Sequence, residues 1–233
     1  MVKSAPAEAG YIPELYGRRQ GKPLKPRQAR LMETLLAKIT LPDPAAGSID
    51  PRLLFPQAEE IGLEIGFGGG EHLAWQAARN RRAAYIGADP YLNGVAKLLV
   101  LVDDEKLDNV RVHAGDARPL MQALPDASLD RLFVIHPDPW PKKRHFKRRM
   151  ISPWFFGEAA RLLKSGGELR VASDIEDYVR WTLMHAQNAA DFEWTATRAA
   201  DWRRRPDDWP QTRYEAKAVR EGRAPAYLIF RRR

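Results

Sequence analysis

Two short stretches of this sequence combine residue types that could bind a ligand and act on it. The stretch LEIGFGGGEH, residues 63–72, places Glu64 just before four glycines, which are Gly66, Gly68, Gly69 and Gly70. The stretch HPDPWPKKRHFKRR, residues 136–149, sets Asp138 between two prolines, adds Trp140, and then packs six lysines and arginines into eight residues. The first suggests a loop that cradles a ligand, and the second an acid beside a polyanion-binding surface.

The glycine-rich stretch predicts the charge of its ligand. A dinucleotide fingerprint has the pattern G-x-G-x-x-G, but Glu71 occupies its third glycine position and Glu64 adds a second acid. A carboxylate beside the helix N-terminus would repel a pyrophosphate, although it also suits the helix dipole as an ordinary structural choice. The pattern therefore favours a cationic ligand, and S-adenosylmethionine carries a sulfonium and an ammonium without a phosphate.

Further acids follow the next strands of the expected sheet. Asp89 ends the second strand, where it can accept hydrogen bonds from both ribose hydroxyls of an adenosyl cofactor, NAD included. Asp116 ends the third strand and can accept from an adenine amino group, but it is equally suited to cap the following helix. Asp138 ends the fourth strand and would lie over the methyl donor, with an Asx-turn as the alternative interpretation.

The elements that position these residues alternate between strands and helices, which predicts βαβ units. Apolar runs predict strands at residues 60–66, 83–89, 109–115, 128–136, 166–173, 192–197 and 226–232. Helical segments are expected between the first five, at residues 71–79, 93–107, 117–124 and 151–164. Only an arginine-rich stretch is expected between the last two strands, which would form an antiparallel, hairpin-like pair. The predicted fold class is α/β, Rossmann-like and doubly wound, with a mostly parallel seven-stranded sheet and an antiparallel last strand.

Composition narrows the class of protein. The chain has 233 residues, a formal net charge of +8 and no cysteine, which excludes disulfides, thiolate zinc sites and a cysteine nucleophile. Basicity favours a nucleic-acid partner. No membrane span or secretory signal is expected, so we predict a cytoplasmic location. We predict a basic N-terminal arm with a short helix at residues 1–55 and one catalytic domain at residues 56–233.

Five motifs together resemble one enzyme family. LEIGFGGG, GDA at 115–117, PDPWPKKRHFKRR, ASD at 172–174 and TRYE at 212–215 are similar to those of bacterial tRNA (guanine-N7-)-methyltransferases, in order across residues ~60–231. The resemblance implies the class I methyltransferase fold and methylation of N7 in guanine 46, in the tRNA variable loop. The family often has phenylalanine at the position of His136 and glutamate at the position of Asp89. We assign His136 no role.

The resemblance also implies a set of site residues. Asp138 would be the catalytic acid. S-adenosylmethionine would contact Glu64, Gly66, Gly68, Asp89, Asp116 and Asp138. The guanine would contact Lys142, Asp174, Thr212, Arg213, Tyr214 and Glu215, with helical surface charge as the alternative for Glu215. The tRNA would contact Lys143, Arg144, His145, Phe146, Lys147, Arg148 and Arg149.

The chemistry fits these roles without a strong base. Guanine N7 carries a lone pair and no proton, so the reaction needs in-line positioning and a fixed carboxylate that stabilises positive charge on the ring. Other interpretations are a methyltransferase acting on another RNA or on protein, an NAD-dependent oxidoreductase, and a non-catalytic RNA-binding protein. The sequence leaves open whether the protein is a monomer or a homodimer.

Overall fold

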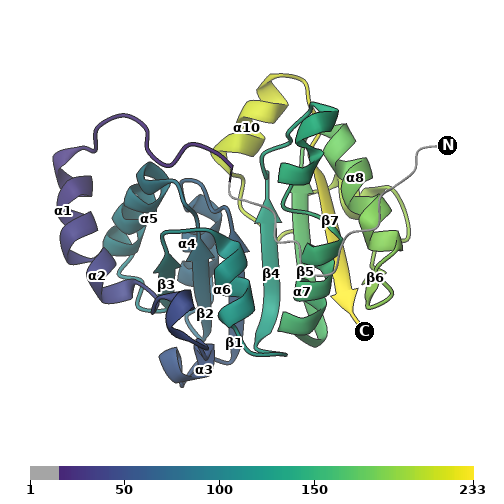
Figure 1. The fold of residues 1–233 in the computed structure, drawn as a ribbon. Coiled ribbons are helices and arrows are strands. Elements are labelled where there is room, and N and C mark those ends of the chain that lie inside the picture. Colours follow the sequence, from purple (N-terminus) through teal and green to yellow (C-terminus); the bar gives the residue numbers. More distant parts are fainter. Residues whose placement is uncertain (1–15) are drawn as a thin grey trace.

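The structure, a computed structural model, describes residues 16–233 and is organised around one seven-stranded sheet (Figure 1). The strands lie in the order β3-β2-β1-β4-β5-β7-β6, and all neighbours pair in parallel except at β7, which is antiparallel to both β5 and β6. Their bounds are β1 Glu60–Ile65, β2 Ala83–Ala88, β3 Val110–His113, β4 Leu129–Ile135, β5 Leu163–Ser173, β6 Phe192–Trp194 and β7 Ala226–Arg232. The predicted fold class is confirmed.

Successive residues of a strand point to opposite faces of the sheet. Both sets are largely apolar here, so helices cover both faces. On one face, α4 (Glu71–Arg79) and α5 (Leu92–Asp104) share an apolar cluster with α1 (Pro26–Thr34) and α2 (Leu36–Ile39). On the other, α6 (Ala117–Ala123), α7 (Pro153–Leu162) and α8 (Glu176–Gln187) pack with the side chains of Ile61, Leu63 and Ile65. The remaining helices are η1 Pro44–Ala46, α3 Pro51–Leu54, η2 Lys143–Arg148, α9 Ala200–Arg203 and α10 Arg213–Arg220.

The strand order reverses between β1 and β4. The chain passes from β1 outward to β2 and β3, and it then returns to the other side of β1 as β4. The carboxyl ends of β1 and β4 are therefore neighbours at a topological switch point, where open α/β sheets bind ligands. α10 lies over this end of the sheet (Figure 1). The glycine-rich loop and the PDPW loop follow these two strands.

Part of the predicted N-terminal arm packs on the domain. Arg27 forms ion pairs with Asp103 and Asp104 at the end of α5. Leu31 and Ile39 are buried in the apolar cluster that also contains α5. Residues 1–15 of the arm lie outside the described residues, and the division at residues 55 and 56 stays a prediction.

Two predictions about the connections were wrong. The segment between β6 and β7 was expected to be only an arginine-rich stretch, but it contains α9 and α10. The sequence analysis also placed no helix after β5, where the structure has the 12-residue helix α8. Within residues 16–233, no helix is both long enough and apolar enough to cross a lipid bilayer.

Candidate active site

The glycine-rich loop turns sharply between β1 and α4. Gly66, Gly68 and Gly70 have φ angles of +71°, +60° and +79°, a region that side chains with a Cβ rarely adopt. A Cβ at Gly66 would meet no atom within 4 Å, so the loop is open on that side. At Gly94 in α5, a Cβ would lie 2.1 Å from the carbonyl oxygen of Gly68. Glycine therefore allows α5 to touch the back of the loop while its front faces a cavity.

That cavity, of about 470 Å³, is lined by acidic residues. Glu64, Asp89 and Asp138 lie on its wall together with Gly66 and Gly68, which gathers five of the six predicted cofactor contacts. The described start of the arm, residues 16–18, also borders it. Glu71 is a fourth carboxylate on the cavity wall, and three arginines, Arg18, Arg118 and Arg148, also border it. The acids around the glycine loop suit a cation there and disfavour a pyrophosphate.

Asp89 links the loop to the next strand end. Its carboxylate accepts hydrogen bonds from the backbone N–H of Gly68 at 2.7 Å and of Tyr91 at 2.8 Å. Burial raises the pKa of Asp89 to about 6, although these two hydrogen bonds favour the ionised form. The residue is 6% exposed, and an additional donor such as a ribose hydroxyl would stabilise its charge.

The PDPW loop holds Asp138 in strained backbone. His136 and Trp140, on either side of the Pro-Asp-Pro segment, have φ angles of +49° and +42°. These angles are uncommon for residues with a Cβ and mark a conformation that the surroundings enforce. Burial raises the pKa of Asp138, and within residues 16–233 no side chain or backbone N–H donates a hydrogen bond to its carboxylate. Its charge is thus uncompensated and faces the cavity.

Arg149 does not belong to the basic surface, contrary to our prediction. Its side chain is 1% exposed, and its Nε donates to the carbonyl oxygen of Pro139 at 2.9 Å. It also pairs with Asp177 at 2.5 Å, and its guanidinium lies 3.8 Å from the ring centroid of Phe146. A guanidinium enclosed in this way holds the PDPW loop and cannot reach a phosphate.

The other residues of the stretch 142–149 differ in their exposure. Lys142, Lys143, Arg144 and Lys147 are exposed at or within η2, as a phosphate-binding surface requires. Phe146 points inward and packs on Trp181, with ring centroids 5.1 Å apart.

His145 and Arg148 are half-buried beside Trp140. The centroid of the His145 ring lies 5.8 Å from that of Trp140, and the guanidinium of Arg148 lies over Trp140 and over Tyr16 of the arm. The RNA-binding roles of His145, Phe146 and Arg148 stay predictions.

Asp174 follows β5 and is held by two side chains that the sequence analysis did not use. Arg223 donates from Nε to its Oδ2 at 2.6 Å, and His136 Nδ1 lies 3.2 Å from its Oδ1. Burial acts to raise the pKa of Asp174, but the hydrogen bonds from Arg223 and His136 outweigh it and the pKa is lowered. Burial also lowers the pKa of His136. His136 therefore orients Asp174.

The TRYE residues form the first turn of α10. Thr212 caps the helix by accepting from the N–H of Glu215, which is buried and pairs with Arg205 at 3.2 Å. Thr212 and Tyr214 line the cavity, and a Cβ at Gly68 would lie 3.1 Å from the Tyr214 ring. Arg213 pairs with Glu71 at 3.3 Å. Tyr214 therefore lies beside the glycine loop, and its contact with guanine stays a prediction.

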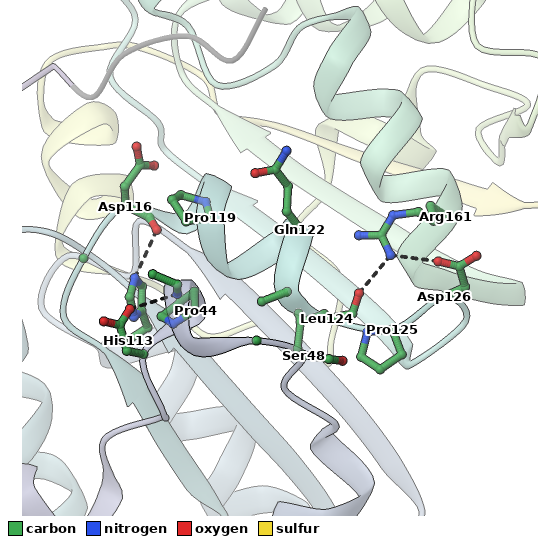
Figure 2. A pocket seen from close by; sticks show the side chains of 15 residues that line it. Pro44, Ser48, His113, Asp116, Pro119, Gln122, Leu124, Pro125, Asp126 and Arg161 are labelled. Atoms are coloured by element: carbon green, nitrogen blue, oxygen red, sulfur yellow. Dashed lines mark hydrogen bonds and ion pairs between the residues drawn. The ribbon is translucent and has the colours of Figure 1, made fainter. Parts of the chain in front are cut away.

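Asp116 borders a different space from the other predicted cofactor contacts. Its carboxylate caps α6 by accepting from the N–H of Arg118, and it also pairs with the Arg118 side chain at 3.1 Å. It lies on the wall of a cavity of about 810 Å³ between η1 and α6, where its carbonyl oxygen contacts His113 (Figure 2). The helix-cap interpretation is confirmed, and its contact with adenine stays a prediction.

Comparisons with known proteins agree with this fold and site. Residues 58–228 match the model of a family described as "Putative methyltransferase". The aminoglycoside resistance methyltransferase NpmB1 is similar in structure, with a TM-score of 0.53, 16% identity, and coverage of 80% of this chain and 94% of that one. Precorrin-6y C5,15-methyltransferase from Geobacter metallireducens has a TM-score of 0.51, 13% identity and coverage of 88% of both chains. The fold is that of the class I methyltransferases, and the protein is an enzyme of that class.

Two curated relatives narrow the class. The tRNA (guanine-N(7)-)-methyltransferase of Rhodospirillum rubrum is 54% identical over 222 residues, covering 94% of this chain and 87% of the relative. The protein of that name from Rhizobium meliloti is 50% identical over 220 residues, covering 93% and 94%. This chain belongs to the tRNA (guanine-N(7)-)-methyltransferase family, and the resemblance seen in its motifs is confirmed.

Proposed function

We propose that this enzyme transfers the methyl group of S-adenosylmethionine to N7 of guanine 46 in the variable loop of tRNA. The observation that supports it most strongly is one juxtaposition. The uncompensated carboxylate of Asp138 faces the acidic cavity over the glycine loop, and the cationic helix η2 begins five residues later. A tRNA substrate also implies a cytoplasmic enzyme, and we leave a monomer and a homodimer equally open.

The residues of the cavity fit the proposed cofactor. Bound there, S-adenosylmethionine would supply an electrophilic methyl group on a sulfonium. Gly66 and Gly68 let the backbone approach it, Glu64 can pair with its ammonium group, and Asp89 can accept from its ribose hydroxyls. Asp116 would accept from its adenine.

Asp138 acts on charge and not on a proton. Positive charge develops on the guanine ring as N7 is methylated, and a fixed carboxylate in a site with little water stabilises it. Within residues 16–233, no side chain forms an ion pair or hydrogen bond with the Asp138 carboxylate, so the carboxylate is free to face the substrate. The strained backbone at His136 and Trp140 holds the carboxylate in place.

The guanine edge would be read by Asp174 and Glu215. Both carboxylates can accept from the N1–H and the N2 amino group of guanine. Arg223 pairs with Asp174 and Arg205 pairs with Glu215, and these ion pairs orient the two carboxylates. Lys142, Thr212, Arg213 and Tyr214 complete the proposed guanine contacts. Phosphates flanking the base would bind the exposed cations of η2, which supplies affinity but little sequence preference.

The first test is a product analysis. Purified enzyme is incubated with unmodified tRNA transcripts and S-adenosylmethionine, and the nucleosides and their positions are identified by mass spectrometry. We expect N7-methylguanine at position 46. Methylation of another nucleoside or of protein alone would overturn the proposal.

The second test is Asp138→Asn, which removes the charge and keeps the shape. We expect kcat to fall about 10²–10³-fold, as for loss of one transition-state-stabilising group, with tRNA affinity within about twofold of normal. Asp207→Asn makes the same substitution at an exposed site and should leave kcat unchanged. Normal turnover in the Asp138 variant would contradict the electrostatic role.

A further inference from the structure

A buried polar chain crosses the interior of the enzyme beside the glycine loop. Glu64 on β1 and His72 on α4 are each 2% exposed, and Gln76, one helical turn after His72, is 4% exposed. Buried polar side chains are normally retained only with hydrogen-bond partners. These three bond to one another, and none of the five family motifs explains His72 or Gln76.

The donor and the acceptor of each of these hydrogen bonds can be assigned in only one way. Gln76 Nε2 lies 2.8 Å from the carbonyl oxygen of Asp208, which can only accept, so the amide nitrogen must face it. The second N–H of that nitrogen meets His72 Nε2 at 3.1 Å, which makes Nε2 an acceptor. The single ring proton is then on Nδ1, and it is donated to Glu64 Oε2 at 2.8 Å.

Glu64 and Asp208, the two ends of this series of hydrogen bonds, lie at the two halves of the proposed active site. Glu64 lines the cavity over the glycine loop. Asp208 begins the short segment that leads through Trp209 to Thr212 and α10, and Trp209 packs on His72 with ring centroids 5.5 Å apart. Helix α4 is therefore bonded to the segment that carries the proposed guanine contacts.

We propose that His72 is a positioning residue, which aims the Glu64 carboxylate at the methyl donor and ties that carboxylate through Gln76 to the backbone of Asp208. This inference rests on the proposed function, in which S-adenosylmethionine occupies the cavity. His72 also borders the cavity, but in this proposal it acts through Glu64 and contacts neither cofactor nor substrate. It fixes one oxygen of Glu64, so that the other is free to face the ammonium group of the donor.

Two substitutions of His72 test the roles of its two ring nitrogens separately. His72→Asn places an amide nitrogen near the position of Nδ1 and can still donate to Glu64. His72→Gln reaches instead toward the position of Nε2, so Glu64 loses its donor. We expect S-adenosylmethionine to bind His72→Asn within about threefold of wild type and His72→Gln at least tenfold more weakly, by calorimetric titration without tRNA. In steady state, KM for the donor should rise in His72→Gln while kcat at saturating donor changes less than about threefold.

A double-mutant cycle tests whether His72 acts through Glu64. In a Glu64→Gln background, His72→Gln should cause no additional loss of donor affinity. If His72→Gln does not fold, Gln76→Leu provides the measurement, because it frees the imidazole to change tautomer while leaving Glu64 and His72 in place. We expect Gln76→Leu to weaken donor binding about threefold or more.

The outcomes separate this inference from the proposed function. Failure of wild-type enzyme to bind S-adenosylmethionine or S-adenosylhomocysteine would reject the proposed function itself. If wild type binds but both His72 variants bind equally well, or are weakened equally, the positioning role is refuted. Unchanged donor affinity in a folded Gln76→Leu variant, or additive losses in the cycle, would refute it as well.

Discussion

Arg149 and Lys147 are two residues apart in one cationic stretch, yet the structure predicts opposite consequences for their loss. Arg149 is enclosed between Pro139, Asp177 and the ring of Phe146, whereas Lys147 is exposed on η2. Replacing each by methionine keeps an unbranched apolar stem and removes the charge. Arg149→Met should therefore destabilise the fold and the PDPW loop, and Lys147→Met should affect only tRNA binding.

The magnitude for Arg149 follows from its contacts. A hydrogen bond from a charged donor to the Pro139 carbonyl contributes about 1.5–3 kcal/mol. The desolvated contact with the Phe146 ring adds roughly 1 kcal/mol. Asp177 is 54% exposed and can be rehydrated, so its loss of a partner adds little. We expect a loss of about 2.5–4 kcal/mol in the free energy of unfolding, which lowers Tm by about 5–16 °C in a domain of this size.

The functional consequence follows from the released carbonyl. Without Arg149 the Pro139 carbonyl has lost its donor, and Asp138 is one residue away. We expect kcat to fall about tenfold through misplacement of the carboxylate. Thermal unfolding, steady-state kinetics and tRNA binding across a range of salt concentrations measure the three effects separately.

The matched variant makes the reasoning refutable. Lys147→Met should keep Tm within about 1 °C and reduce the salt dependence of tRNA binding by roughly one phosphate contact. If Arg149→Met instead keeps the wild-type Tm and reduces the salt dependence as Lys147→Met does, Arg149 contacts RNA and the tethering argument is wrong.

Two further predictions concern charge. The pKa of Asp89 is raised to about 6 in the fold, so its ionisation opposes folding, and the donor-free enzyme should lose stability from this group as pH rises from about 4 to about 6. Donor binding favours the ionised form, so affinity for S-adenosylmethionine should fall as pH drops below about 6, and calorimetry from pH 5 to 8 would show no such fall in Asp89→Asn. Replacing Lys143 and Arg144 by alanine should weaken tRNA binding and lower its salt slope by about 1.4–1.8, whereas Lys164→Ala, at the opposite end of the sheet, should not; an unchanged slope in the double variant would place the RNA elsewhere.

The central strands were predictable because the apolar residues that they bury are contiguous in the sequence. In the strand Leu129–Ile135, the last four residues are a continuous apolar run buried on both faces. The position of Asp138 follows from the rule that ligands bind at the carboxyl ends of parallel strands. The elements that the prediction missed have no such signal. In α10 the buried side chains include Glu215 and Ala218, which form no apolar stripe, and in α8 Thr182 interrupts it.

The roles of individual arginines could not be read from the sequence. Arg149 looks like its neighbours in a charge run, and its burial depends on Asp177 and Trp181 from a helix about thirty residues later. Arg223 pairs with Asp174 from 49 residues away along the chain, and Arg205 pairs with Glu215 ten residues away across the start of α10. Long-range pairs of this kind leave no spacing that a pattern could detect.

The place of β7 in the sheet has a consequence for how the chain folds. β5 is complete at Ser173, but its neighbour is the stretch Ala226–Arg232, and β6 reaches the sheet only through that same stretch. During synthesis, the edge of β5 therefore stays unpaired until β7 emerges, and an unpaired edge is a site for aggregation. Truncated products that lack β7 should be the aggregation-prone species, since one late strand closes both the sheet and its outer edge.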